Sequence, residues 1–253
     1  MSDPVYLYGK NPLKEVLLLA KRIEAMPIEK LYITKDAEKD SELISLIQSN
    51  KLNYEIVTKE EIESFVGRGT LNQGICARLN ENMLYKSLEE VLGNNENRTS
   101  KKLYVLLDEL QDPHNVGAII RSAAAFGVDA LLVPTHNQVL INATVIKASS
   151  GMAFVVPIVK IGNVNTVIEK LKEKGFWTYG LTGGGDTKLA DAKFDTNTLL
   201  IAGNEGDGIK QKTLEVCDFR VSIETNQLCE SLNVSNAVAV ALYEWRGQQK
   251  KII

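Results

Sequence analysis

Residues 112–134 join a polar turn to an apolar helix that carries one cationic side chain. Asn115, at the end of the turn, is of a type that caps helices. Arg121 and Ser122 are the only polar side chains expected on the following helix, which should be largely buried. A buried guanidinium must meet a carboxylate, a carbonyl or an anionic ligand, because leaving it unpaired costs several kcal/mol. An exposed Arg121 at the helix edge is an equally good interpretation.

Two glycine clusters follow apolar segments that read as strands: GGG at 183–185 and GNEGDG at 203–208. The second cluster has the order G-x-x-G-x-G, the reverse of the dinucleotide-binding fingerprint, and neither cluster precedes the Lys-Ser/Thr pair of a phosphate-binding loop. Tight turns that need positive φ would explain one such cluster. Two clusters after two strands favour a ligand site.

The third segment, residues 229–247, starts with polar residues and continues as an apolar helix. A capped core helix is the simplest interpretation. The free amides of such a cap can also bind a carboxylate or a phosphate, so a ligand remains an alternative. The polar residues at its start are Glu230, Ser231, Asn233 and Ser235.

The elements that carry these segments form a βαβ pattern in residues 103–253. Apolar strands are predicted at 103–108, 130–134, 176–181 and 198–203, and helical patterns separate them. Strands this continuously apolar are buried on both faces, so we expect an α/β domain with a mostly parallel sheet between helices. Ligand-binding loops then lie at the carboxyl ends of the strands.

Residues 1–79 predict a separate, smaller α/β domain. Apolar residues between Leu13 and Ile23 recur with helical spacing, and strands are expected at 31–34 and 75–79. Thr58 followed by Glu61 is a capping-box pair that should open a short helix. Residues 80–102 are the expected linker, with a candidate helix at 84–92 and a polar, asparagine-rich stretch after it.

Composition restricts the class of protein. The 253 residues are 44% hydrophobic with a formal net charge of -3, so any contact with nucleic acid must use local patches rather than bulk electrostatics. We find no apolar run long enough for a membrane helix and no secretion-signal pattern, and we expect a cytoplasmic protein. Cys76, Cys217 and Cys229 form no Cys-x-x-Cys pair, and with two histidines they support neither a disulfide framework nor a metal site.

Taken in order, the three segments resemble the motifs of the SPOUT class of RNA methyltransferases, and within it the TrmH-like ribose 2'-O-methyltransferases. Residues 203–209 and 231–235 match the second and third motifs. Residues 8–17, YGKNPLKEVL, are similar to the start of the substrate-binding domain in the bacterial subfamily that methylates a guanosine of large-subunit ribosomal RNA. The first motif is matched by Asp112, Pro113, Asn115, Gly117 and Arg121.

The resemblance implies a catalytic domain with a deep trefoil knot at 103–253 and a ribosomal-protein-like RNA-binding domain at 1–79. It implies a homodimer in which the partner completes each active site. The substrate would be structured RNA, ribosomal RNA rather than transfer RNA, methylated on the ribose of a guanosine. The cofactor would be S-adenosylmethionine, with no metal, bound in a bent shape against backbone groups of Thr182, Gly183, Gly203, Ile223 and Leu232.

The resemblance also assigns roles to side chains. It makes Arg121 essential for activating the ribose hydroxyl, although a guanidinium that stays protonated is an awkward general base. One departure from the family pattern is the loop 223–227, which lacks the usual proline, methionine and glycine and adds Glu224. His114 is more simply a polar turn residue than a base. The remaining catalytic residues would be Asn115, Glu205, Asn233 and Ser235.

Three other functions fit parts of the pattern. A transfer-RNA methyltransferase would share the catalytic motifs. A non-catalytic RNA-binding or ribosome-assembly protein would keep the knotted scaffold and would fail to bind S-adenosylmethionine. A nucleotide-dependent dehydrogenase would also use an open α/β sheet, but the glycine spacing argues against it.

Overall fold

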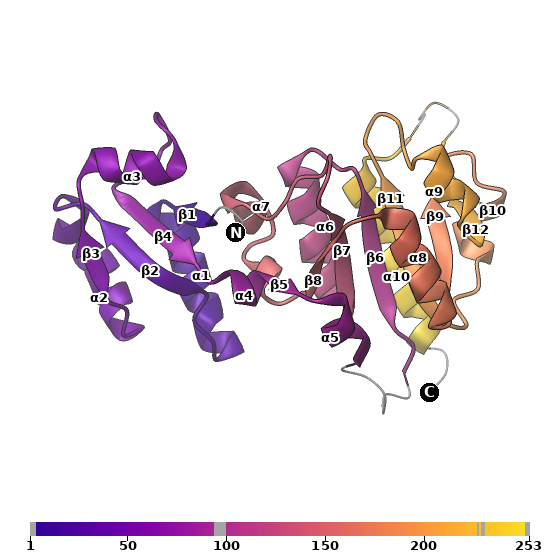
Figure 1. Ribbon diagram of the computed structural model, residues 1–253, viewed down its shortest axis with the longest axis horizontal. Helices are drawn as coiled ribbons and strands as arrows, with labels where there is room; N and C mark the ends of the chain where they lie inside the picture. The colour runs from indigo at the N-terminus through magenta and orange to yellow at the C-terminus, as the bar shows by residue number, and fades with distance from the viewer. Residues whose placement is uncertain (1–3, 94–99, 227, 229–230, 251–253) are drawn as a thin grey trace. The chain divides into compact units, whose positions relative to one another are not determined.

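The computed structural model describes residues 4–93, 100–226, 228 and 231–250, and the chain divides into two compact units (Figure 1). Unit 1 contains residues 1–84 together with 141–155, and unit 2 contains residues 85–140 and 156–253. Residues 141–155 thus belong to unit 1, although in sequence they lie between two strands of unit 2. Within the described ranges, no helix is both long enough and apolar enough to cross a membrane.

Unit 1 is built on a four-stranded sheet with the order β1-β4-β2-β3. Strand β4 pairs antiparallel with β1 and β2, whereas β2 and β3 are parallel. The strands are β1 (Tyr6–Tyr8), β2 (Ile28–Ile33), β3 (Tyr54–Ile56) and β4 (Ile75–Leu79). The helices are α1 (Lys10–Ile23), α2 (Ser41–Ser49), α3 (Lys59–Val66), α4 (Glu81–Leu84) and α7 (Ala143–Ala148), with 3-10 turns at Ala37–Lys39 and Met152–Phe154.

Local sequence explains the main helices of unit 1. The apolar face of α1, which runs from Leu13 to Ala20, is buried as its helical spacing predicts. Helix α1 is capped at its carboxyl end by the exposed Glu24, which adopts the left-handed conformation with φ 52°. The predicted capping box opens α3: the Thr58 hydroxyl accepts from the Glu61 amide at 3.2 Å, and the Glu61 carboxylate accepts from the Thr58 amide at 2.7 Å.

Unit 2 is built on an eight-stranded sheet with the order β10-β12-β9-β11-β6-β7-β8-β5, and its described strand pairs are all parallel. The strands are β5 (Tyr85–Lys86), β6 (Leu103–Asp108), β7 (Ala130–Pro134), β8 (Ile158–Ile161), β9 (Phe176–Leu181), β10 (Thr187–Lys188), β11 (Asn197–Gly203) and β12 (Phe219–Ser222). The helices are α5 (Leu88–Gly93), α6 (Pro113–Phe126), α8 (Val164–Glu173), α9 (Gln211–Glu215) and α10 (Val234–Lys250), with a 3-10 turn at Leu189–Asp191.

Helices cover both faces of the large sheet. Alternate residues of a strand point to opposite faces, so Tyr104 and Leu106 of β6 share one apolar cluster with Ile168 of α8. On the other face α10 packs against α6 and β11, and the Trp245 indole of α10 donates to the Thr198 hydroxyl of β11 at 3.1 Å. The predicted parallel sheet between helices is therefore confirmed.

The four strands predicted from apolar runs are present as β6, β7, β9 and β11. Strands β8 and β12 were not predicted, because each has four residues and β12 carries polar side chains. Part of the expected linker is folded: β5 and α5 lie within residues 80–102, and β5 pairs with β8. Residues 94–99 of that linker lie outside the described residues.

The strand order reverses at β6. Chain order runs outward from β6 through β7 to β8 on one side, while β11 and β9 lie on its other side. In open parallel sheets, ligands bind at the carboxyl ends of strands beside such a switch point. The topology therefore predicts a ligand site at the loops that follow β6, β9 and β11.

Candidate active site

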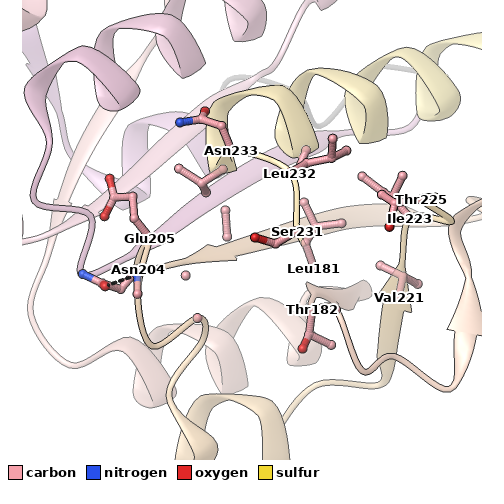
Figure 2. A pocket seen from close by; sticks show the side chains of 17 residues that line it. Leu181, Thr182, Asn204, Glu205, Val221, Ile223, Thr225, Ser231, Leu232 and Asn233 are labelled. Atoms are coloured by element: carbon pink, nitrogen blue, oxygen red, sulfur yellow. Dashed lines mark hydrogen bonds between the residues drawn. The ribbon is translucent and has the colours of Figure 1, made fainter. Parts of the chain in front are cut away.

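A pocket of about 390 Å³ lies at the carboxyl ends of β9, β11 and β12, beside the start of α10. Figure 2 shows Glu205 and Asn233 toward the left of this pocket and Ile223 and Thr225 toward the right. Thr225 and Asn204 also line the pocket and were not predicted from the sequence. The five residues expected to contact a cofactor all line it: Thr182, Gly183, Gly203, Ile223 and Leu232.

Two glycines of the two clusters permit a close approach of backbone segments. A Cβ atom on Gly203 would overlap the backbone of Gly208 and Ile209, which crosses directly over the end of β11. A Cβ atom on Gly185 would come within 2.7 Å of the Arg220 carbonyl oxygen. Of the two clusters, only Gly208 has positive φ, at 71°. The tight-turn interpretation therefore accounts for Gly208 and not for the rest.

Asn204 organises the turn at residues 204–208. Its backbone amide and carbonyl pair with the carbonyl and amide of Gly208, at 2.9 and 3.0 Å. Its side-chain oxygen accepts from the Gly206 amide at 2.8 Å, the bond drawn in Figure 2. An asparagine directly after a strand and before glycines is the signal that could have identified this turn from sequence.

Four of the five expected catalytic side chains form one chain of hydrogen bonds. The Asn115 amide group donates to the Glu205 carboxylate at 2.9 Å, and the Asn115 side-chain oxygen accepts from the Asn233 amide group at 3.0 Å. The Asn233 side-chain oxygen in turn accepts from the Ser235 hydroxyl at 2.6 Å and from its backbone amide at 2.9 Å. The start of α6, the turn after β11 and the start of α10 are thereby joined.

The start of α6 differs from the expectation that Asn115 caps it. Asp112 is the cap, since its carboxylate accepts from the His114 amide at 2.8 Å and Pro113 occupies the first helical turn, where its missing amide costs nothing. Asn115 is therefore inside the helix and only 8% exposed, which frees its side chain for Glu205 and Asn233.

Arg121 is exposed on α6, so the buried alternative was wrong. The buried face of α6 is formed by Val116, Ile119 and Ile120, and Arg121 projects away from it. In the described ranges Arg121 makes no hydrogen bond or ion pair, and it does not join the chain of four residues. It is a cation available to an external partner.

The start of α10 is capped as predicted, by Asn233, and Cys229 and Glu230 of that segment lie outside the described residues. In the unusual loop, Glu224 forms an ion pair with Lys188 of β10 at 2.6 Å. The hydrogen bond to Glu224 raises the pKa of Lys188. Lys188 thus neutralises the added Glu224 carboxylate beside the pocket. Gln227 of the same loop lies outside the described residues.

The pocket's chemistry suits a cofactor that combines an apolar ring with a positive charge. Most lining side chains are apolar or absent, and Glu205 is the single charged side chain among the described lining residues. The described part of the chain contains no group of three or more His, Cys, Asp or Glu side chains that could hold a metal ion.

Comparisons with known proteins agree with this geometry. Residues 102–243 match the SpoU rRNA methylase family, and residues 6–84 match a family described as RNA 2'-O ribose methyltransferase substrate binding. The chain is 30% identical over 244 residues to a putative TrmH family tRNA/rRNA methyltransferase of Staphylococcus epidermidis, covering 96% of this chain and 95% of that protein. It is 40% identical over 179 residues to the 23S rRNA (guanosine-2'-O-)-methyltransferase RlmB of Xanthomonas campestris, covering 71% and 72%.

A solved structure shares the fold. The SpoU methyltransferase AviRb from Streptomyces viridochromogenes, in complex with the cofactor AdoMet, superposes with a TM-score of 0.79 at 23% identity. The match covers 98% of this chain and 91% of that chain.

Proposed function

Because the chain belongs to the SpoU rRNA methylase family, we propose that it transfers a methyl group from S-adenosylmethionine to the ribose 2'-hydroxyl of a guanosine in 23S-type ribosomal RNA. The observation that carries the proposal is the continuous chain of hydrogen bonds from Glu205 through Asn115 to Asn233 at the edge of the pocket. The substrate follows from relatives named as 23S rRNA guanosine methyltransferases, at 36% and 40% identity.

S-Adenosylmethionine fits the pocket by its chemistry. Apolar walls suit the adenine, and the Glu205 carboxylate suits the positive sulfonium. Backbone groups of Thr182, Gly183, Gly203, Ile223 and Leu232 would hold it. When bound, it supplies an electrophilic methyl carbon for in-line displacement by the ribose oxygen.

The chain's own residues align the ribose and assist the removal of the proton from its 2'-hydroxyl. Positioning supplies most of the rate of such a displacement, and Asn115 and Asn233 fix the wall against which the ribose must lie. Arg121, exposed and unpaired among the described residues, binds the RNA and helps to activate its hydroxyl. A guanidinium is best suited to stabilising the developing oxyanion and to holding a phosphate that can take the proton.

The proposal includes a trefoil knot, a homodimer and action in the cytoplasm. The knot is proposed from the family alone, because the close approach of Gly208 and Ile209 to Gly203 is a contact within one tight turn. The face of α10 beside α6 supports a dimer, because Tyr243 is 70% exposed there and contacts Phe126 of α6 edge-on. A partner on that face would lie close along α6 to Arg121.

Unit 1 is proposed to bind the RNA, because residues 6–84 match a substrate-binding family. Transfer RNA is the second candidate substrate. A relative from Mycoplasma pneumoniae, 32% identical over 98% of this chain, is named an uncharacterized tRNA/rRNA methyltransferase.

The test is transfer of radiolabelled methyl from S-adenosylmethionine to unmodified 23S ribosomal RNA and to unmodified transfer RNA, mapped for alkali-resistant 2'-O-methyl linkages. We expect label in ribosomal RNA alone. Label in transfer RNA alone would keep the chemistry and change the substrate. Label in neither, with no cofactor binding, would leave a non-catalytic RNA-binding protein.

A further inference from the structure

Glu109 occupies an unusual backbone position beside the pocket. It directly follows β6 and has φ 65°, a left-handed backbone conformation that residues other than glycine rarely adopt. Strain of this kind persists where the surrounding structure holds it, often near functional sites. Glu109 is not among the site residues predicted from the sequence.

Glu109 holds both ends of the turn that carries Glu205. Its backbone carbonyl accepts from the Asn204 side chain at 2.8 Å, where the turn begins. Its carboxylate accepts from the Lys210 ammonium at 2.5 Å, just after the turn ends. Parallel pairing of β6 with β11 places Gly203 beside Asp108, so Glu109 is the next residue along that pair.

The same carboxylate oxygen also accepts from the Asn137 amide group at 3.0 Å, in the loop after β7. Glu109 thus joins the loops that follow β6, β7 and β11. Its side chain is 22% exposed, and the hydrogen bonds from Lys210 and Asn137 keep the pKa of Glu109 low, so the carboxylate stays ionised. A charged acceptor shared by two donors restrains both more tightly than a neutral one.

We propose that Glu109 is a positioning residue for the methyl-transfer site. It fixes the turn 204–208, so that Gly203 and Asn204 line the cofactor pocket and Glu205 meets Asn115. It acts through the turn and does not itself line the pocket. The inference rests on the proposed function, since it requires that the pocket bind S-adenosylmethionine.

Glu109→Gly separates this role from a role in the fold. Glycine adopts positive φ without strain, so the variant should have a Tm equal to or above that of the unaltered protein. Loss of the charged tie should raise the Kd for S-adenosylmethionine, measured calorimetrically, by about tenfold. In methylation assays the KM for the cofactor should rise while the KM for RNA stays constant. Glu109→Gln keeps a neutral acceptor without the charge, so its Kd should lie between those of the unaltered protein and Glu109→Gly.

Glu24→Gly is the matched control. Glu24 is the same residue type in the same conformation, φ 52°, but it is exposed at the end of α1 in unit 1. Its replacement should raise Tm and leave the cofactor Kd unchanged. Lys210→Met should raise the cofactor Kd as much as Glu109→Gly does. The double variant should have the same Kd as either single variant, because both substitutions remove the same ion pair.

The outcomes separate this inference from the proposed function. An unaltered protein that fails to bind S-adenosylmethionine overturns the proposed function, and the inference falls with it. Normal binding by the unaltered protein and equally tight binding by Glu109→Gly overturns the inference alone. A lowered Tm for Glu109→Gly also overturns it, since the side chain would then serve the fold.

Discussion

Replacing Asn115 with aspartate should make the active-site hydrogen bonds depend on pH. Asn115 is 8% exposed and donates to the Glu205 carboxylate at 2.9 Å. Aspartate has the same shape and keeps an acceptor for Asn233. It also puts a carboxylate oxygen where the amide donor met Glu205, so an attraction becomes a repulsion.

The structure sets the size of the effect. Two carboxylate charges about 4 Å apart repel by about 4 kcal/mol at an effective dielectric of 20 and by about 1 kcal/mol in bulk water. Glu205 is exposed and Asn115 is buried, so an intermediate value of about 2 kcal/mol is appropriate. Adding about 1.5 kcal/mol for the lost hydrogen bond to a charged group gives about 3.5 kcal/mol, or roughly 400-fold slower methyl transfer at neutral pH.

Lower pH should restore part of this activity. The introduced carboxyl, once protonated, regains a donor for Glu205, and the folded protein therefore holds that proton more tightly than the unfolded chain does. A group with this preference stabilises the fold at low pH, and the stabilisation is lost as the pH rises and the carboxyl ionises. Activity relative to the unaltered protein should thus rise from pH 7.5 to pH 5.5, a range set by raised carboxyl pKa values of about 6.

The assay is single-turnover transfer of labelled methyl at saturating cofactor, with each variant divided by the unaltered protein at the same pH. Asn115→Ala is the control, since it removes both hydrogen bonds and adds no titrating group. Its relative activity should be low and flat with pH. Matching profiles for the two variants, or full activity of Asn115→Asp at pH 7.5, would refute the reasoning.

Four further predictions concern other parts of the chain. Arg121→Ala should abolish methyl transfer while calorimetry shows cofactor binding nearly unchanged; loss of both would identify a structural arginine. Gly203→Ala should lower the free energy of unfolding by about 1–3 kcal/mol in urea titrations, because its methyl group would overlap a crossing backbone, and an unchanged midpoint would contradict that crossing. Glu224→Gln should change the cofactor Kd by less than about threefold at physiological salt, since both partners of its ion pair with Lys188 are more than half exposed; a larger change would make the pair a determinant of the pocket. Burial raises the pKa of the Cys76 thiol to about 12, so a thiol reagent at pH 8 should label it only after unfolding, and rapid labelling of the folded protein would be evidence against the buried position.

Sequence patterns predicted the large sheet well because its strands are continuously apolar. Strands β6, β7 and β9 occur at the predicted residues, and β11 begins one residue earlier. Strand β8 follows Pro157 and is short, and β12 has only four residues, of which one is fully buried, so neither gave a strong signal. Apolar runs identify buried strands, whereas short strands depend on pairing with neighbours that are distant in sequence.

The active site could be assembled only through the family resemblance. Asn115 lies 90 residues from Glu205 and 118 from Asn233, and neither periodicity nor composition reports such separations. Capping rules misplaced Asn115, because an aspartate and a proline before it provide a better helix start. Glu109 carried no signal at all, since its backbone conformation is imposed by tertiary contacts.

Residues 141–155 complete unit 1 although they lie far from residues 1–84 in sequence, and this separation affects how the protein folds during synthesis. Unit 1 is discontinuous in sequence, so it is still incomplete when residues 1–84 have emerged from the ribosome. Strand β1 then still lacks the packing of α7, and Leu19 lacks the neighbouring Gly151, whose missing side chain leaves room for it. Strands β6 and β7 of unit 2 are synthesised before that missing piece emerges. Cotranslational folding cannot finish the first unit before the second has begun, and the nascent chain must carry its unfinished apolar surface through that interval.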